Sequence, residues 1–434
     1  MGFPVASSFV SRAPVLRTAS PGALVIGGAL PLLFLHRTWQ PAAGSVALSD
    51  LAVLAVVVAA VWSGVRDGFA PLLAGRWIWA AWGFLAVWLA LATLYGAARF
   101  GAYPFRTHLV TLLKWYEYAL LAPALPLLVR TRRDLEVVLW SLALWSAAAT
   151  LVGVLEWFGL AVAAKGTFGK RQASFLGSSD FAALSGGALL AGVVVRRGPL
   201  AWTLIAAGAL GSVIAGSLSA LLGLATAFAV VLLVVVRREP RRAVALAAVL
   251  GVIAVGSIAI RTADLSAFHR FLGGNSSSGN AHKVETYAHR TTLAYIGYRI
   301  WRGHPLLGVG WQGSKDPWAY MPYVRAAKQK YPHESPLAFP TPTRSYGIQL
   351  LYLEALADLG PAGLLALAAL FGTTLVVAAR ARANAAGAIA ALWILFVVWC
   401  WTAQDFVAGI PLDALTWLAV GLAATGAAWR RADA

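Results

Sequence analysis

The sequence predicts an all-α, polytopic membrane protein with about 12 transmembrane helices and one large external loop that contains short helices. Hydrophobic residues make up 60% of the chain and charged residues only 12%, which is about half of the roughly 25% that covers a soluble protein. The apolar runs are about 17–23 residues long, enough to cross a hydrocarbon core of roughly 30 Å. Because these runs are continuously apolar instead of alternating with polar residues, they indicate helices and not the strands of a membrane barrel.

Apolar runs account for most of the chain, and we treat residues 1–434 as a single integral membrane domain. No internal repeat and no long Ser/Pro linker divides it. The predicted spans are 22–36, 47–65, 77–97, 108–129, 135–158, 179–195, 199–215, 217–236, 243–260, 361–379, 385–405 and 411–428. The last three spans make up residues 361–428.

The connections between spans predict the orientation, because cytoplasmic loops of membrane proteins collect Lys and Arg. Basic residues follow every even-numbered span, which predicts that both termini are cytoplasmic. They are Arg66 and Arg76, then Arg130, Arg132 and Arg133, then Arg196 and Arg197, then Arg237, Arg238, Arg241 and Arg242, then Arg380 and Arg382, and finally Arg430 and Arg431. Arg12 and Arg17 precede the first apolar run as in a signal peptide, but small residues suited to cleavage do not follow it convincingly, so we expect an uncleaved first helix.

Residues 262–360 contain no apolar run of lipid-spanning length, and we expect them to form the large extracytoplasmic loop. Between Thr262 and Tyr346 ten Lys or Arg stand against four acids, and five of the seven histidines of the chain lie in this loop. External loops usually avoid such charge, so an anionic ligand is the simplest explanation. The cytoplasmic connections explain much of the remaining net charge of +18, and we expect no nucleic-acid partner. Cys400 is the single cysteine, which excludes an intrachain disulfide and a cysteine-based metal site.

Two segments of the chain carry motifs. The first, His289 to Gly313, reads HRTTLAYIGYRIWRGHPLLGVGWQG and passes from helical spacing into a glycine-rich turn. Its GVGWQG string matches the dinucleotide fingerprint in letters only, because a helix precedes it and no βαβ unit surrounds it. The second, Gln349 to Leu370, reads QLLYLEALADLGPAGLLALAAL. An amphipathic stretch ends there at Gly360, and Pro361 opens the next span at a position where proline is tolerated.

These segments resemble the O-antigen ligase and O-antigen polymerase family of membrane glycosyltransferases. Arg290 precedes Pro305-Leu306-Leu307-Gly308-Val309-Gly310 at the spacing of the family pattern R…W…PLLGVG. Tyr352-Leu353, Ala357-Asp358-Leu359-Gly360 and Pro361-Ala362-Gly363 match a second pattern, HNSYLQLLAELGLPGLLLFL, and Gly166-Thr167-Phe168 with Ser179-Asp180-Phe181-Ala182 gives a weaker third match. The resemblance covers the external loop and its flanking spans, whereas the first 150 residues match only in hydropathy. It implies a GT-C-like membrane fold in the cytoplasmic (inner) membrane of a bacterium.

The resemblance also implies an activity: transfer of a glycan from a polyprenyl diphosphate-linked donor to an acceptor hydroxyl on a lipid core, a growing polysaccharide or a wall glycan, as in the biosynthesis of lipopolysaccharide and other envelope polysaccharides. It implies no metal and no cofactor. Fixed guanidinium groups stabilise the charge that develops on a leaving diphosphate, and Arg290 is the first choice for this role. The family's base histidine aligns with Gln349, which cannot take up a proton, so His289, His304, His333 and Glu334 stay open as the base. The residues expected in the site are Arg290, His289 and His333 for catalysis and Arg171, Lys170, Asp180, Gln349, Arg344 and Arg299 for substrate binding.

Two other functions compete with this interpretation. A transporter or flippase for a lipid-linked or anionic solute would predict repeats and charges spread through the spans, and the missing histidine would suit a non-catalytic assembly partner. The sequence leaves the oligomeric state, the sugar and the acceptor open. His282, Glu285 and His289 share one helix face as in a metal site, although a hydrated polar face has the same pattern. Lys114 and Glu117, three residues apart in the fourth span, are close enough to pair across one helical turn. They indicate either a functional cavity in the membrane or an internal ion pair that fixes helix packing.

Overall fold

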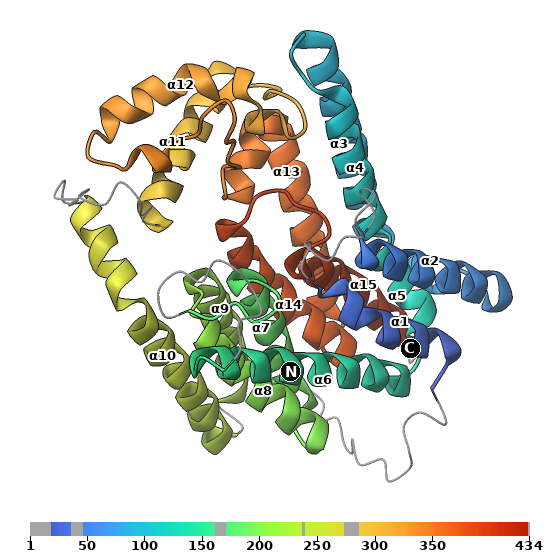
Figure 1. Ribbon diagram of the computed structural model, residues 1–434. Coiled ribbons are helices and arrows are strands. Elements are labelled where there is room, and N and C mark those ends of the chain that lie inside the picture. The colour runs from blue at the N-terminus through green and yellow to red at the C-terminus, as the bar shows by residue number, and fades with distance from the viewer. Residues whose placement is uncertain (1–18, 36–46, 161–170, 237–238, 273–285, 433–434) are drawn as a thin grey trace.

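A computed structural model of the chain describes residues 19–35, 47–160, 171–236, 239–272 and 286–432 (Figure 1). Every regular element in these ranges is a helix, which confirms the predicted all-α fold. Some residues considered above lie outside the described ranges: Arg12, Arg17, Gly166, Thr167, Phe168, Lys170, Arg237, Arg238, His282 and Glu285.

The described residues hold nine helical segments that are long and apolar enough to cross a membrane, so the protein is a polytopic membrane protein. These segments are α2 (Leu48–Asp67), the 3₁₀ helix η2 (Ala70–Gly75) continued by α3 (Arg76–Arg99), α6 (Arg132–Trp157), α7 (Ser178–Val195), α9 (Leu218–Val235), α10 (Pro240–Leu272), α13 (Leu351–Arg380), α14 (Ala385–Cys400) with η5 (Trp401–Ala403), and α15 (Pro411–Ala432). Two shorter apolar helices, α1 (Pro21–Leu33) and α8 (Pro199–Ala215), occupy the first and seventh predicted spans.

The fourth predicted span, residues 108–129, is divided between two helices. They are α4 (Phe105–Ala119) and α5 (Leu121–Leu128), and they meet at Leu120. Within this span, Lys114 makes its salt bridge to a neighbouring helix, with Nζ 2.5 Å from Asp50 Oδ2 on α2. Because a charge in an apolar environment needs a counter-charge, this ion pair ties α4 to α2.

Helices α7 and α15 form the centre of the bundle, since almost all of their side chains are buried. The middle of α8 packs tightly on α7, where Gly208 lies against the backbone of Ser185 and Leu189. Small residues allow this close approach between membrane helices. In contrast, α2 exposes Trp62 and Val65, which are 70% and 73% accessible. Such apolar side chains face lipid in a membrane protein.

The segment that the sequence predicts as the external loop contains α11 (Thr286–Gly303), η3 (Gly313–Lys315), α12 (Pro317–Lys330) and η4 (Pro336–Ala338). Figure 1 shows α11 and α12 together at one end of the bundle, beside the beginning of α13. They enclose a hydrophobic cluster of their own, separate from the core of the bundle, that includes Ile296, Ile300, Val324 and Phe339. The loop is therefore a packed structure and can hold side chains in place.

Candidate functional site

The first turns of α11 carry the two residues that the first motif singled out, His289 and Arg290. Leu293, Ile296 and Ile300 follow on one face of the helix and are buried, as the helical spacing predicts. The two isoleucines belong to the hydrophobic cluster of the loop. This packing fixes the rotation of α11, and with it the place of His289 and Arg290 one turn before the first buried leucine.

His289 is 9% exposed and lies against the end of η4. Its Nδ1 is 2.8 Å from the carbonyl oxygen of Ala338. Because a carbonyl only accepts hydrogen bonds, Nδ1 carries the hydrogen and Nε2 keeps its lone pair in the neutral ring. Burial lowers the pKa of His289 and the nearby Arg290 and Arg344 lower it further, against the opposite effect of the Ala338 hydrogen bond. The imidazole is thus neutral at neutral pH and able to accept a proton.

Arg290 contacts Gln349, which aligns with a histidine in the pattern that the sequence resembles. Its Nε donates to Gln349 Oε1 at 3.3 Å. Gln349 has a φ of 53°, in the left-handed region that non-glycine residues seldom adopt. The backbone just before α13 therefore turns this amide toward α11, where it orients the guanidinium group.

Arg344 completes this group of residues. Its guanidinium carbon is 5.6 Å from the centre of the Tyr346 ring, and that ring packs edge-on against His289 with 4.5 Å between centroids. Four predicted residues, His289, Arg290, Arg344 and Gln349, are thus brought together although they are up to 60 positions apart in the sequence. We call them the α11 cluster.

The other predicted residues of the loop lie elsewhere. Arg299 is farther along α11, where its Nη1 donates to Tyr295 Oη at 3.0 Å and its guanidinium lies near the Tyr323 ring. His333 is exposed in the turn after α12. Their roles in the site stay predictions.

Arg171 and Asp180 lie near the ends of the bundle helices. Arg171 is 7% exposed and lies against Gly216, the left-handed residue that ends α8. Arg261 of α10 reaches the same turn, and its Nη1 donates to Gly216 O at 3.2 Å. Asp180, in the first turn of α7, accepts a hydrogen bond from the backbone of Leu412 at the beginning of α15. Lys170 lies outside the described residues.

Sequence reasoning missed Arg261. This arginine follows the ninth predicted span, at the end that the predicted orientation places outside. Cations are uncommon at such positions, so its place in the sequence was a usable signal. Arg171 and Arg261 thus both contact the turn at Gly216 that ends α8.

The glycine-rich turn Gly308–Gly313 and the beginning of α13 dock on each other, which gives both motifs a structural role. Val309 N donates to Ala357 O at 3.0 Å and Gly310 N donates to Asp358 O at 2.9 Å. Gly308 and Gly360 both have a φ near 70° and face the partner backbone so closely that a Cβ would clash. Gly360 also breaks α13 just before Pro361, as the sequence predicted.

A buried ion network follows this turn. Lys315 Nζ lies 3.0 Å from Glu354 Oε1 of α13 and 2.7 Å from Asp405 Oδ2. It also donates to Phe406 O at 3.0 Å, while Phe406 N donates to Glu354 Oε2 at 2.6 Å. Burial by itself lowers the pKa of Lys315, but the two carboxylates raise it above its usual value, so the ammonium stays charged. In the sequence Lys315 is one of ten cations of the loop, and no neighbouring residue indicates these partners.

Comparison with known families connects this geometry to a function. Residues 202–368 match the family model described as O-antigen ligase. These residues form an O-antigen ligase family domain. The domain runs from α8 into α13 and includes the α11 cluster, the glycine-rich turn, Arg261, Lys315 and Glu354, whereas Arg171 and Asp180 precede it. A search of curated proteins gave no match.

The family agrees with the resemblance seen in the sequence. The protein is thus a membrane protein that contains an O-antigen ligase family domain, and this family acts in polysaccharide and lipopolysaccharide biosynthesis as ligase- or polymerase-type transferases. The O-antigen ligase domain of this chain differs from the family pattern at Gln349. In its structure, Gln349 accepts a hydrogen bond from Arg290.

Proposed function

We propose that the protein transfers a glycan from a polyprenyl diphosphate-linked donor to an acceptor hydroxyl on the extracytoplasmic side of the cytoplasmic membrane. The observation that carries this proposal is the α11 cluster, which combines two guanidinium groups and a neutral imidazole in the O-antigen ligase domain. The acceptor is a glycan or glycolipid, such as a lipid core, a growing polysaccharide or a wall glycan.

In this mechanism the acceptor oxygen attacks the anomeric carbon of the donor sugar, and the bond from that carbon to the diphosphate oxygen breaks. The electron pair of the broken bond stays on the diphosphate. Arg290 and Arg344 stabilise that charge, because fixed guanidinium groups need no reorganisation when charge develops. Gln349 positions Arg290 through the 3.3 Å hydrogen bond.

The proton of the acceptor hydroxyl goes to His289 Nε2. Of the four groups that the sequence left open as the base, His289 is the one that lies beside Arg290 and has a lowered pKa with its Nδ1 engaged by Ala338. A positioned base typically contributes about 10²–10⁴-fold to the rate. No step of this mechanism needs a metal ion or a cofactor.

Transfer is tested with purified full-length protein in liposomes, supplied with a synthetic polyprenyl diphosphate glycan and an acceptor. We expect release of polyprenyl diphosphate together with elongation of the acceptor. Arg290→Ala is expected to lower the rate at least a hundredfold, whereas Arg302→Ala, an exposed arginine three turns along the same helix, should keep it. Wild-type turnover in the Arg290 variant would remove this residue from the mechanism, and solute movement without bond cleavage would favour the transporter.

We also propose that the chain crosses the membrane twelve times, with both termini in the cytoplasm. The basic connections lie on one face only if α4 with α5 makes one crossing and α8 makes another. Without a crossing at α4 and α5, the arginines before α3 and those after α5 would lie on opposite sides of the membrane. Without a crossing at α8, the same would hold for the arginines after α7 and those after α9. With 17 residues, α8 is about 25 Å long, close to the hydrocarbon thickness of roughly 30 Å.

Cysteine labelling tests this topology. In a Cys400→Ser background, we expect a membrane-impermeant maleimide to label Leu306→Cys in spheroplasts, because Leu306 is 78% exposed in the external loop. Arg197→Cys, in the connection after α7, should be labelled only after the membrane is opened. Labelling in the reverse order would place the α11 cluster in the cytoplasm and refute the proposed function.

A further inference from the structure

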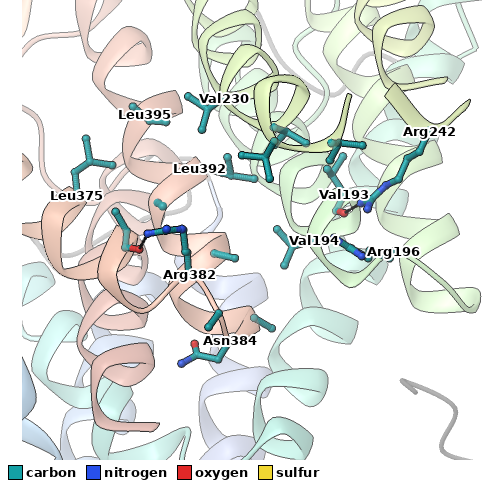
Figure 2. Close-up of a pocket in the computed structure, with 18 residues that line it drawn as sticks. Val193, Val194, Arg196, Val230, Arg242, Leu375, Arg382, Asn384, Leu392 and Leu395 are labelled. Atoms are coloured by element: carbon teal, nitrogen blue, oxygen red, sulfur yellow. Dashed lines mark hydrogen bonds between the residues drawn. The ribbon is translucent and has the colours of Figure 1, made fainter. Parts of the chain in front are cut away.

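A cavity of about 360 Å³ lies at the end of the bundle that carries the basic connections. It is bounded by the last turns of α7, α9 and α13 and the first turns of α10 and α14 (Figure 2). Its walls are mostly valine, leucine and alanine side chains, including Val193, Val230, Leu375 and Leu392. Its volume falls within the range of roughly 300–1,000 Å³ that is usual for small-molecule sites.

Three arginines from three different connections lie around this cavity. Figure 2 shows Arg196 and Arg242 on one side and Arg382 on the other. Arg196 and Arg242 share the carboxylate of Glu239, at 3.4 and 3.3 Å. Among the described side chains around the cavity, three guanidinium groups thus face one carboxylate. The entrance of the cavity is therefore positively charged.

The remaining polar groups at this end already have partners within the protein. The Asn384 side chain accepts from Gly387 N at 3.0 Å and donates to Gly426 O at 2.8 Å, so it caps α14 and ties it to α15. Arg242 Nη2 donates to Val193 O at 2.8 Å, which makes this arginine partly structural. Arg382 Nη1 likewise donates to Ala379 O at 2.8 Å, and Arg196 shares Glu239. Because a guanidinium group has five N–H donors, Arg196 and Arg382 keep donors for a ligand, and they approach it from opposite sides of the cavity (Figure 2).

The shape of the cavity matches one leaflet of a membrane. Its lining residues on α14 run from Ala385 at the charged end to Leu395, which is about 15 Å at 1.5 Å per residue. Half of a hydrocarbon core of roughly 30 Å has the same length. A ligand with a charged head beside the arginines and an apolar chain reaching the mid-plane would fill it.

The cavity is remote from the α11 cluster. Asp358 of α13 contacts the glycine-rich turn of the external loop, and Ala379 of the same helix lines the cavity. These two residues are about 30 Å apart along the helix. The two sites thus lie at opposite ends of the bundle.

We propose that this cavity binds an anionic phospholipid, with its phosphate held between Arg196 and Arg382 and one acyl chain along the valine and leucine walls. Basic pockets between transmembrane helices on the cytoplasmic side bind anionic lipid head groups, and guanidinium groups suit phosphate oxygens. A small soluble anion would leave the apolar walls unused. A polyprenyl chain is longer than one leaflet, and its diphosphate is bound in the proposed transfer reaction at the other end of the bundle.

Native mass spectrometry of the full-length protein in detergent tests this proposal. The probes are phosphatidylglycerol, phosphatidylcholine, a polyprenyl phosphate and inorganic diphosphate. We expect phosphatidylglycerol to bind at least about tenfold more tightly than the other three, since it alone combines a net negative head with chains of one-leaflet length. Equal binding of phosphatidylcholine, or preference for the polyprenyl phosphate or the diphosphate, would overturn it.

Two kinds of variant locate the lipid. Arg196→Gln combined with Arg382→Gln should reduce phosphatidylglycerol binding at least about tenfold, whereas Arg133→Gln, an exposed arginine at the beginning of α6, should leave it unchanged. Ala388→Leu keeps every arginine and narrows the cavity, so it should weaken binding without changing the melting temperature of the lipid-free protein. Wild-type binding in a folded double variant, or in Ala388→Leu, would refute the assignment.

Discussion

Lys315 offers a sharp test of how the external loop is held on the membrane helices. Its Nζ is 3.0 Å from Glu354, 2.7 Å from Asp405 and 3.0 Å from the Phe406 carbonyl oxygen. The Glu354 side chain is fully buried and the Lys315 side chain is only 20% exposed. Lys315→Met keeps the volume of the side chain and removes its charge, so two mostly buried carboxylates lose their shared cation.

The magnitude follows from the cost of an unpaired charge. Breaking a buried ion pair by removing one partner costs about 3–5 kcal/mol, because the remaining ion stays desolvated. Phe406 N still donates to Glu354 Oε2 in the variant, which offsets part of this loss. We therefore expect the free energy of unfolding to fall by about 3 kcal/mol or more.

The measurement is the unfolding of purified protein in detergent, followed by tryptophan fluorescence. Arg325→Met, an exposed cation on α12, is the matched control and should change stability by less than about 0.5 kcal/mol. The double variant Lys315→Met with Glu354→Gln should lose less than the sum of the two single changes, because one unpaired charge disappears. A loss below about 1 kcal/mol in Lys315→Met, or strict additivity with Glu354→Gln, would refute the reasoning.

Three further predictions follow from the structure. Gly308→Ala should lower the unfolding free energy by about 2 kcal/mol or more, because the residue has a positive φ and the new Cβ would clash with the backbone of Asp358. The control Gly372→Ala lies in open space on α13 and should be neutral or slightly stabilising in the same assay. His289 has a lowered pKa, so the unfolded chain binds more protons and stability falls as pH drops through about 6.5; His289→Gln should flatten that part of the melting-temperature profile, and an unchanged slope would contradict it. Gln349→Leu removes the acceptor of Arg290 Nε and should reduce transfer about tenfold, whereas kinetics equal to wild type would exclude a positioning role for this amide.

Much of the fold could be predicted from the sequence. The apolar runs and the basic connections appear in the linear order of residues, because lipid selects composition over windows of about 20 residues. The break at Gly360 was also predictable, since Pro361 cannot continue the preceding hydrogen-bonding pattern. The fourth span was predicted as one helix, and the division at Leu120 was not foreseen.

The partners of the charged residues required the tertiary structure. The three-residue spacing suggested Glu117 as the partner of Lys114. In the structure, the packing of α2 brings Asp50, 64 positions away in the sequence, next to that lysine. Lys315 likewise meets Glu354 and Asp405 only because the glycine-rich turn docks on α13. Residues that are distant in the chain become neighbours through helix packing, and no local pattern records that.

The sequence by itself determined that this is a polytopic membrane protein with a long cation-rich loop and the motifs of the O-antigen ligase family, because composition, periodicity and motif spacing are properties of the linear chain. The tertiary structure decided which of those cations act together: Arg290 and Arg344 meet at His289, while Arg299 turns to Tyr295 and Tyr323. The physical reason is that the side-chain packing of α11 against the loop cluster fixes the rotation of the helix, and this rotation selects the residues that face one another.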